Sequence, residues 1–420
     1  MKSILLKNVL VHNAIQNILI IGNKIAKIGS MPEQPASETL DCKGKLAAFP
    51  PFYNTHNHAA MTLLRGYGAD VTLDDWLGKF IWPIENKMNA EDIYAGTRLA
   101  ILEMIKSGTV FFNDMYWFPE AIVKAVEEMG IRACVGLLQI CGPDGEILDR
   151  NRIGNQQLEA MPHSERIMLA VAPHAIYTVS EKRLREIAYE TKNNNRIIHI
   201  HANETQTEVD NCVEQYGRRP IEMLDEFGCL SERTILAHAV HLNERERELI
   251  RERGCWLSHC PTSNLKLCSG MFNLDMVERV AGITKTTLGT DGAASNNNLS
   301  MLETMKIGSL VAKTSSDSVL SGTSSQMFEM ATERGARAFG LDAGVLAEGK
   351  LADVMLVKLD HPTMVADADL VSNLVYAADS SVIHSVICNG EFVMRDGIVP
   401  GEDEIIAEAR ERWRHLKSLI

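Results

Sequence analysis

The sequence predicts an α/β protein: a central (β/α)8 TIM barrel, with a small β-sandwich-like module formed by both chain ends. Short apolar runs alternate with longer segments of helical period through the middle of the 420-residue chain. This alternation indicates βαβ units and a parallel sheet. Hairpin patterns occur near both ends, and polar side chains follow several of the apolar runs, as they do at the C-terminal face of a barrel.

Eight apolar runs are short enough to be buried strands. A closed barrel explains this number better than an open doubly wound sheet, which would need a glycine-rich phosphate loop after its first strand. The sequence contains no GxGxxG or GxxxxGK[ST] pattern. The predicted strands cover residues 47–54, 110–113, 133–139, 168–173, 197–200, 234–237, 255–258 and 285–289.

Both ends of the chain have the pattern of short antiparallel β-structure. Apolar stretches flank a turn around Asn23 near the start and the pair Asn389-Gly390 near the end, and an Asn-Gly pair between alternating apolar residues is a strong hairpin signal. Apolar residues spaced by three and four over 405–420 predict an amphipathic helix. We expect residues 1–50 and 350–420 to form a composite small module with a C-terminal helix, and residues 51–349 to form the barrel.

The composition limits the possible partners and the location. A formal net charge of −13 argues against nucleic acid or an anionic membrane, because both attract basic surfaces. Nine cysteines without a CxxC pair are typical of free thiols in a reducing compartment. No signal-peptide core and no run of about 18 apolar residues occurs. We expect a cytoplasmic homo-oligomer that acts on a small molecule.

Histidines and one aspartate stand at the ends of predicted strands. His56 and His58 are two residues apart on an extended segment, so both rings point to one side. His201, His238 and Asp291 each end a later predicted strand. Because strand ends meet at one face of a barrel, these side chains should converge. Imidazole and carboxylate ligands suit Zn²⁺ or another borderline divalent metal.

His199 and His201 share one face of their strand, so either could bind the metal. His201 is nearer the strand end and is followed three residues later by Glu204, which makes it the better ligand. We expect His199 to fill an inner layer of the barrel as a hydrogen-bonded core residue.

Three segments resemble the amidohydrolase superfamily, and within it the group of 5-methylthioadenosine/S-adenosylhomocysteine deaminases, which are related to chlorohydrolases and guanine deaminases. The segments are 51–58 (PFYNTHNH), 201–204 (HANE) and 288–296 (LGTDGAASN). The resemblance extends over nearly the whole chain and includes 258–266 (SHCPTSNLK). It implies one divalent ion, with Zn²⁺ preferred over Fe²⁺ or Mn²⁺, held by His56, His58, His201 and Asp291.

The same resemblance implies a hydrolytic deamination that removes the 6-amino group of an adenine nucleoside: 5′-methylthioadenosine, S-adenosylhomocysteine or adenosine. A bound Zn²⁺ lowers the pKa of water to about 7 and so supplies hydroxide at neutral pH. Asp291 would act as ligand and base, and His238 would orient the hydroxide and stabilise developing charge. Glu204 would deliver a proton to the ring nitrogen beside the attacked carbon.

Substrate contacts are also implied by the resemblance. Trp76 would pack on the nucleoside, Glu85 would accept hydrogen bonds from ribose hydroxyls, and His174 would contact the purine ring. Hydrophobic packing of a helical lid is the alternative role of Trp76 and of its neighbour Trp82.

The sequence departs from the family pattern in two places. Pro50-Pro51 replaces Pro-Gly before the first motif. The arginine with which some members grip the homocysteine carboxylate corresponds to Leu137 or Gln139 here; Arg150 or Arg152 could replace it.

Two other functions compete with nucleoside deamination. The first keeps the metal and changes the substrate to guanine, cytosine, a pterin or a chlorotriazine. The second is a non-catalytic scaffold, which would lack metal ligands, whereas none is missing from this sequence.

Overall fold

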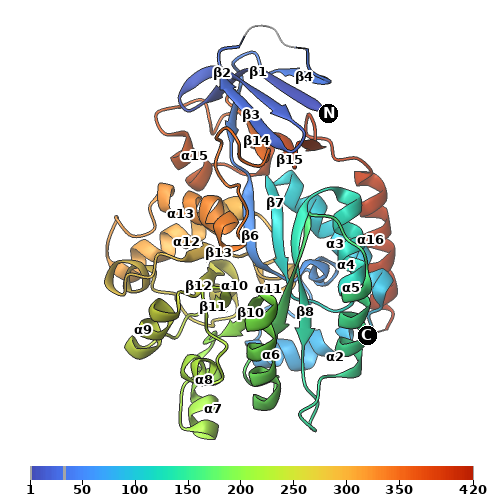
Figure 1. The fold of residues 1–420 in the computed structure, drawn as a ribbon, viewed down its shortest axis with the longest axis vertical. Helices are drawn as coiled ribbons and strands as arrows, with labels where there is room; N and C mark the ends of the chain where they lie inside the picture. The colour runs from blue at the N-terminus through green and yellow to red at the C-terminus, as the bar shows by residue number, and fades with distance from the viewer. Residues whose placement is uncertain (1, 32–34, 420) are drawn as a thin grey trace.

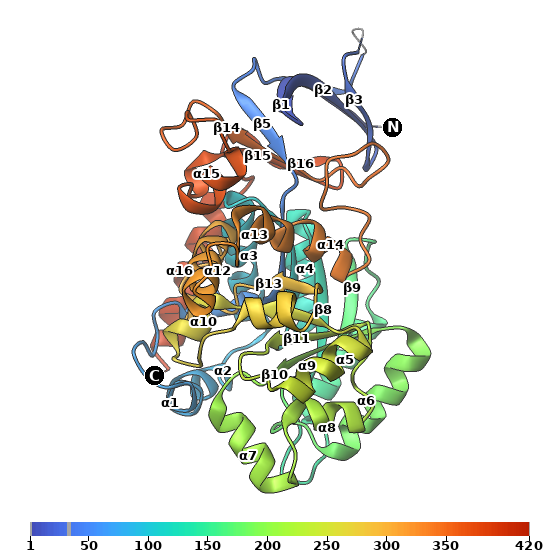
Figure 2. The same ribbon diagram turned by 90° about the vertical axis from the view of Figure 1, so that its left-hand side faces the viewer.

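The computed structural model describes residues 2–31 and 35–419, which form two eight-stranded sheets. The larger one is the predicted barrel, since its parallel strands pair in chain order and helices surround them (Figures 1 and 2). The TIM-barrel prediction is therefore confirmed. Its strands are β6 (Phe52–Asn57), β7 (Thr109–Asp114), β8 (Arg132–Gln139), β9 (Ile167–Pro173), β10 (Ile197–Ala202), β11 (Thr234–His238), β12 (Trp256–His259) and β13 (Thr286–Leu288).

The first predicted strand is wrong in its bounds. Residues 47–54 contain parts of two strands, β5 (Leu46–Phe49) and β6, with Pro50 and Pro51 between them. Proline lacks the N–H that a ladder needs, so the pair ends one strand before the next begins. β5 joins the small sheet, whereas β6 opens the barrel and carries His56.

The barrel closes between its first and last strands through single contacts. The Asp291 N–H donates to the His56 carbonyl at 3.0 Å, and the Thr55 hydroxyl donates to the Leu288 carbonyl at 3.0 Å. Gly289 permits this approach: a Cβ there would lie 2.7 Å from Ser258 Oγ and 2.8 Å from His56 Cβ. Any side chain at Gly289 would push the closing strands apart.

Most helices lie outside the barrel strands, as Figure 2 shows. Several begin at a side chain that caps free N–H groups, such as Asn89 and Asn243. In the described part of the chain, no helix has the length and apolar character needed to cross a membrane. The barrel helices are α3 (Ala90–Lys106), α4 (Pro119–Met129), α5 (Asp149–Ala160), α6 (Glu181–Asn194), α7 (Gln206–Tyr216), α8 (Pro220–Glu226), α9 (Glu244–Arg253), α10 (Pro261–Lys266), α11 (Ala293–Asn296), α12 (Met301–Ser316), α13 (Ser324–Ala331) and α14 (Glu333–Ala338).

The smaller sheet combines both ends of the chain. Its order is β16-β15-β14-β5-β1-β2-β3, with β4 paired to β1. Both predicted hairpins are present, as β2–β3 and β15–β16. The strands are β1 (Ser3–Val11), β2 (Ala14–Ile21), β3 (Lys24–Gly29), β4 (Glu38–Asp41), β14 (Val354–Lys358), β15 (Ile383–Cys388) and β16 (Glu391–Met394).

A buried ion pair joins the small sheet to the N-terminal end of β8. Arg132 binds Asp353 and also donates to Asn389 Oδ1 at 2.7 Å, while the Tyr53 hydroxyl donates to Asp353 at 2.8 Å. The small sheet therefore covers the barrel at the beginnings of β6 to β8 (Figure 1).

Two helices from the C-terminal part of the chain leave the small sheet and lie on the barrel. α16 (Glu402–Lys417) lies against α3, where Arg412 Nε binds Asp92 at 2.7 Å. It is the helix predicted over 405–420. α15 (Leu370–Tyr376) contacts α12 and α13.

Candidate metal centre and active site

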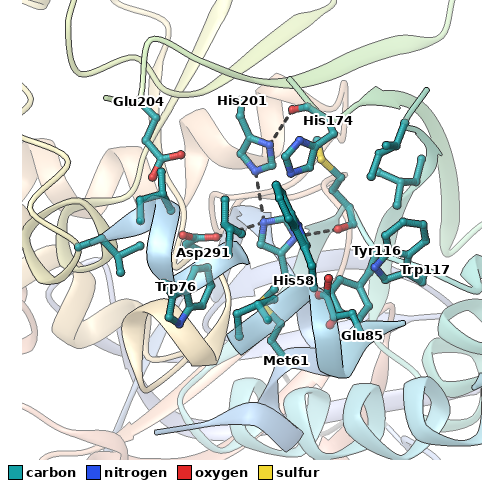
Figure 3. Close-up of a pocket in the computed structure, with 18 of the residues that line it drawn as sticks. His58, Met61, Trp76, Glu85, Tyr116, Trp117, His174, His201, Glu204 and Asp291 are labelled. Carbon is teal, nitrogen blue, oxygen red and sulfur yellow. Dashed lines mark hydrogen bonds and ion pairs between the residues drawn. The ribbon is translucent and has the colours of Figure 1, made fainter. Parts of the chain in front are cut away.

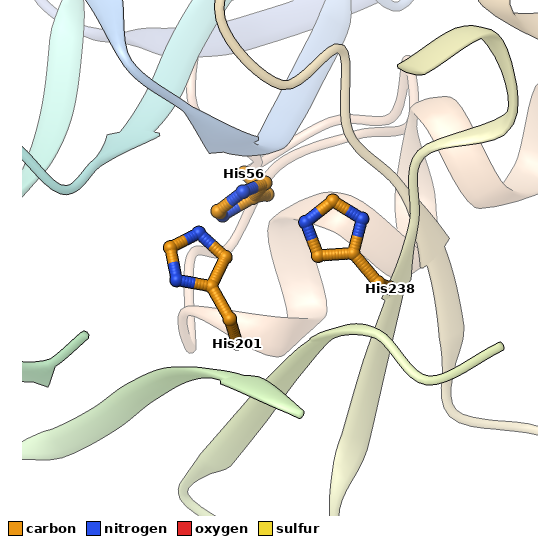
Figure 4. A group of neighbouring side chains, drawn as sticks. All are labelled: His56, His201 and His238. Atoms are coloured by element: carbon orange, nitrogen blue, oxygen red, sulfur yellow. The ribbon is translucent and has the colours of Figure 1, made fainter. Parts of the chain in front are cut away.

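Four histidines and one aspartate meet at the C-terminal ends of the barrel strands. Asp291 Oδ1 is 3.4 Å from His56 Nε2. It is also 3.3 Å from His58 Nε2, and His201 Nε2 is 3.3 Å from His58 Nε2 (Figure 3). His56, His201 and His238 form a second group with ligand atoms within 4.8 Å of one another (Figure 4). All five residues are buried. This arrangement fits a divalent metal ion.

The ring nitrogens of two ligands are oriented by backbone carbonyl groups. His58 Nδ1 donates to the Met115 carbonyl at 2.7 Å, and His201 Nδ1 donates to the His174 carbonyl at 2.7 Å. Each bond fixes the proton on Nδ1 and leaves the Nε2 lone pair directed at the cluster. The two imidazoles are therefore arranged as metal ligands.

His56 is oriented by another histidine. Its Nδ1 lies 2.8 Å from His199 Nε2, while its own Nε2 is buried and has no hydrogen-bond partner among the described residues. Burial lowers the pKa of His56 to about 4, which leaves the ring neutral. An unpartnered, neutral imidazole nitrogen beside Asp291 is the group that a cation would satisfy. His199 lies in the barrel interior behind this nitrogen.

Asp291 is held by two serines. Both hydroxyls donate to Oδ2, from Ser263 at 2.6 Å and from Ser295 at 2.8 Å, so that Oδ1 faces the histidines. Burial opposes the charged form of Asp291, but His56 and His58 beside it hold its pKa well below the usual value. Asp291 is therefore a carboxylate whose Oδ1 accepts the Gly292 N–H at 2.8 Å and is also directed at the histidines, where it can meet an ion or a proton.

The ring of His238 is fixed by a side-chain amide. Asn264 Oδ1 lies 2.7 Å from Nδ1 of His238, and an amide oxygen can only accept a hydrogen bond. The proton of the neutral ring is consequently on Nδ1, and Nε2 faces the cluster as an acceptor. His238 has a positive φ of 69°, which turns its side chain at the strand end toward the site.

Glu204 faces the same space from the end of β10. Its Oε2 is 3.6 Å from His238 Nε2, and Ser269 donates to its Oε1 at 3.2 Å. The Glu204 N–H is held by the carboxylate of Glu208 at 2.7 Å. Burial raises the pKa of Glu204, which favours the protonated form that a general acid needs.

The cluster lies at the base of a pocket with mostly apolar walls. Trp76, Glu85 and His174 line it together with Glu204 and His238, and Figure 3 shows the labelled side chains around one space. The segment between β6 and α3 supplies one wall through α1 (Leu73–Asp75), η2 (Trp76–Ile81) and α2 (Trp82–Glu85). Burial raises the pKa of Glu85.

The arginines considered for substrate binding lie outside this lining. Arg150 stacks on Trp117, with the guanidinium carbon 4.2 Å from the ring centre, and donates to the Glu85 carbonyl at 3.2 Å. Arg152 pairs with Asp149 on helix α5. Among the described residues, no lysine or arginine lines the pocket.

The walls near the end of β8 are apolar and aromatic. Leu138, Ile140, Tyr116 and Tyr177 line this side, whereas Leu137 is not part of the lining. Gln139 points to another partner, since its Oε1 accepts from Arg183 at 3.1 Å.

Several residues of this site are not predicted from the sequence. Ser263 and Asn264 belong to the segment 258–266, but nothing in its pattern reveals that they hold Asp291 and His238. Ser269 is a single hydroxyl in the loop after α10, and Ser295 lies in the short helix α11. Their positions follow only from the folded chain.

Comparison with known proteins agrees with this geometry. The amidohydrolase family model matches residues 47–393. The chain is 42% identical over 405 residues to a 5-methylthioadenosine/S-adenosylhomocysteine deaminase from Archaeoglobus fulgidus, covering 95% of each chain. It is 40% identical to a 5′-deoxyadenosine deaminase from Methanocaldococcus jannaschii, covering 99% of this chain and 100% of that one.

Solved structures show the same similarity. A zinc-bound adenosine deaminase from Xanthomonas campestris superposes with a TM-score of 0.92 at 30% identity, covering 99% of both chains. The chlorohydrolase TrzN from Arthrobacter aurescens shares the fold, with a TM-score of 0.88 at 22% identity, covering 98% of this chain and 100% of that one. From its sequence, its barrel and its cluster of metal-binding side chains, this chain belongs to the amidohydrolase family.

Proposed function

We propose that this protein is a hydrolytic deaminase that removes the 6-amino group of an adenine nucleoside. The observation that carries the proposal is the position of Glu204. Its carboxyl group shares one pocket with Asp291 and the histidine cluster. A proton donor and a metal site in one mostly apolar pocket are what hydrolysis of an aromatic amine requires. The relatives named as adenosine-type deaminases support this function.

We further propose that His56, His58, His201 and Asp291 hold one Zn²⁺ ion. Three imidazoles and a carboxylate are a donor set that zinc prefers, and the related Xanthomonas structure is described with bound zinc. When bound, a divalent ion activates water by lowering its pKa. His201→Ala and Asp291→Ala are expected to lose both metal, measured by atomic absorption, and activity. Full turnover in either variant after chelation would exclude this site.

The side chains divide the proton transfers between them. Asp291 Oδ1 accepts a proton from the attacking water, because its second oxygen is already occupied by two serine hydroxyls. His238 Nε2 accepts a hydrogen bond from that water, since its Nδ1 proton is held by Asn264. Glu204 donates its proton to the ring nitrogen beside the attacked carbon, which makes that carbon more electrophilic. The proton taken up by Asp291 then passes to the amino group, the carbon–nitrogen bond breaks, and ammonia leaves while the hydroxyl proton returns to Glu204 and the 6-carbonyl forms.

The pocket lining supports a nucleoside rather than a free base. Trp76 offers a flat apolar surface, and Glu85 is a buried carboxylate that can accept hydrogen bonds from two ribose hydroxyls. His174 is positioned beside His201, with ring centres 4.8 Å apart, at the place where a purine would meet the cluster.

The charge of the lining favours an uncharged 5′ substituent. A carboxylate buried without a cationic partner is costly, and the described lining offers no lysine or arginine. We therefore propose 5′-deoxyadenosine, 5′-methylthioadenosine or adenosine as substrate, ahead of S-adenosylhomocysteine.

An ammonia-release assay of the zinc-loaded enzyme tests both the deamination of nucleosides and the preference for an uncharged 5′ substituent. The substrates are adenosine, 5′-deoxyadenosine, 5′-methylthioadenosine, S-adenosylhomocysteine, guanine, cytosine and a chlorotriazine, for which chloride release is measured; the matched control is Glu204→Gln. We expect ammonia release from the uncharged nucleosides, weaker release from S-adenosylhomocysteine, and release slower by about 10² or more in the control. Release from guanine or cytosine alone, or dechlorination alone, would refute nucleoside deamination. A preference for S-adenosylhomocysteine would refute only the 5′ assignment.

We also propose that the protein works in the cytoplasm. All nine cysteines are free thiols, and eight of them are buried or half-buried, as is typical of a protein from a reducing compartment.

A further inference from the structure

A second cavity lies at the opposite end of the barrel from the metal centre. Its walls are residues at the beginnings of strands: Arg233 precedes β11, Trp256 begins β12, and Lys285 precedes β13. Arg337 of α14 completes it. The small sheet covers the barrel near the beginnings of β6 to β8, where Arg132 binds Asp353, so the cavity occupies a different part of this face. Its volume is about 510 Å³, within the usual range for small-molecule sites.

The cavity concentrates positive charge on a protein that is negative overall. Arg233, Lys285 and Arg337 line it against a single carboxylate, Glu232, although the chain has a net charge of −13. Of the ion pairs found in the described residues, none includes any of these three cations. In one other surface hollow both arginines are paired with acids.

Two ion pairs show this contrast. Arg218 binds Glu226, and Arg245 binds Glu248 at 3.1 Å; both arginines line the same hollow. The three cations of the second cavity have no such carboxylate partner.

Lys285 and Arg337 each have a contact that positions the cation without neutralising it. The Lys285 ammonium lies 5.5 Å and the Arg337 guanidinium 5.4 Å from the centre of the Trp256 ring, an attraction that leaves N–H groups free. Lys285 Nζ also donates to the Gly254 carbonyl at 2.9 Å. The Nε of Arg233 is buried, and no described residue accepts a hydrogen bond from it.

We propose that this cavity binds a small molecule through a phosphate group. Two guanidinium groups and an ammonium group present several N–H donors, and arginine forks match the oxygens of phosphate in geometry and charge. An oxygen of the ligand would accept the hydrogen bond that Arg233 Nε lacks, and the ligand's charge would replace the missing carboxylates. The hydroxyl of Thr284, on the same wall, adds a further donor.

Isothermal titration calorimetry of the full-length, zinc-loaded protein tests the site at constant ionic strength. The probes are inorganic phosphate, pyrophosphate and adenosine monophosphate, and the tightest binder tells whether the phosphate alone or its organic part is recognised. We expect saturable binding of at least one probe at one site per chain. Binding should weaken about tenfold or more in Arg233→Gln/Arg337→Gln, because two charge-assisted hydrogen bonds are lost. The single variant Arg337→Gln, at an exposed position, should show a smaller loss in the same direction.

The matched control removes the same charge elsewhere. Arg251→Gln/Lys306→Gln lowers the net charge equally at two exposed positions outside the cavity, and should bind as the parent does. Deaminase activity should stay at the parental level in both double variants, which verifies folding. No saturable binding of any probe, an equal loss in the control, or competition with the nucleoside that persists in Arg233→Gln/Arg337→Gln would overturn the proposal.

Discussion

The proton transfer proposed for Glu204 can be tested separately from metal binding. Glu204 lies 3.6 Å from His238 and hydrogen-bonds to Ser269, yet it is outside the group of ligand atoms around Asp291. We expect Glu204→Gln to lower kcat by about 10² or more, the usual contribution of a general acid, while the zinc content stays at one per chain. Steady-state kinetics together with atomic absorption measure both. Unchanged kcat would remove Glu204 from the mechanism.

Asn264 determines which nitrogen of His238 carries the proton. Asn264→Ala removes the acceptor of the Nδ1 proton, so the ring can rotate or change its tautomer. We expect kcat to fall about tenfold or more, as for outer-shell partners of catalytic histidines, with a small change in KM. Asn264→Asp restores an acceptor and should recover part of the rate. Equal, near-parental kinetics in both variants would contradict this role.

Single residues also show what the sequence leaves open. His56, His58, His201 and Asp291 are predictable because strand ends must meet at one face of a barrel. The hydroxyls that donate hydrogen bonds to Asp291 are not predictable in this way, since Ser263 and Ser295 belong to separate helical segments. The position of a serine in the sequence does not show which distant residue its hydroxyl contacts.

The segment between β6 and α3 acts at the scale of one element. Gly68 has a φ of +71°, and a Cβ there would lie 2.8 Å from the Phe80 ring and 3.2 Å from Trp76. The turn thus holds Trp76 against the pocket. We expect Trp76→Ala to raise KM for nucleosides by a larger factor than for the free base adenine as an alternative substrate, because the indole would pack on the nucleoside. Equal factors for both in the ammonia assay would mean that Trp76 does not read the sugar.

The bounds of the first barrel strand show what hydrophobic patterning cannot predict. The run from 47 to 54 is continuous in hydrophobicity but belongs to two sheets, and only the proline pair marks the division. The remaining barrel strands agree with prediction within a few residues, because each lies between helices of clear period. Hydrophobic patterning therefore identifies the barrel but merges β5 of the small sheet and β6 of the barrel into one predicted strand.

At the scale of the whole molecule, one buried ion pair connects the two sheets. Asp353→Asn would leave the Arg132 guanidinium, which is 3% exposed, without a counter-charge. Such a loss costs about 3–5 kcal/mol, so we expect a clear fall in the urea unfolding midpoint. Arg132→Met/Asp353→Leu, which removes both charges, should lose less. An unchanged midpoint in Asp353→Asn would show that the pair contributes no stability. Activity at 25 °C should change little, since the pair is at the far end of the barrel.

The boundary between β13 and β6, where the barrel closes, affects the stability of the metal-bound protein. These strands share only isolated hydrogen bonds, while Asp291 and His56, from the two sides of the boundary, face one another across 3.4 Å. A cation bound by both would act as a cross-link and favour the closed barrel by mass action. Chelation should then accelerate amide exchange first along this boundary, before the remaining strands begin to open.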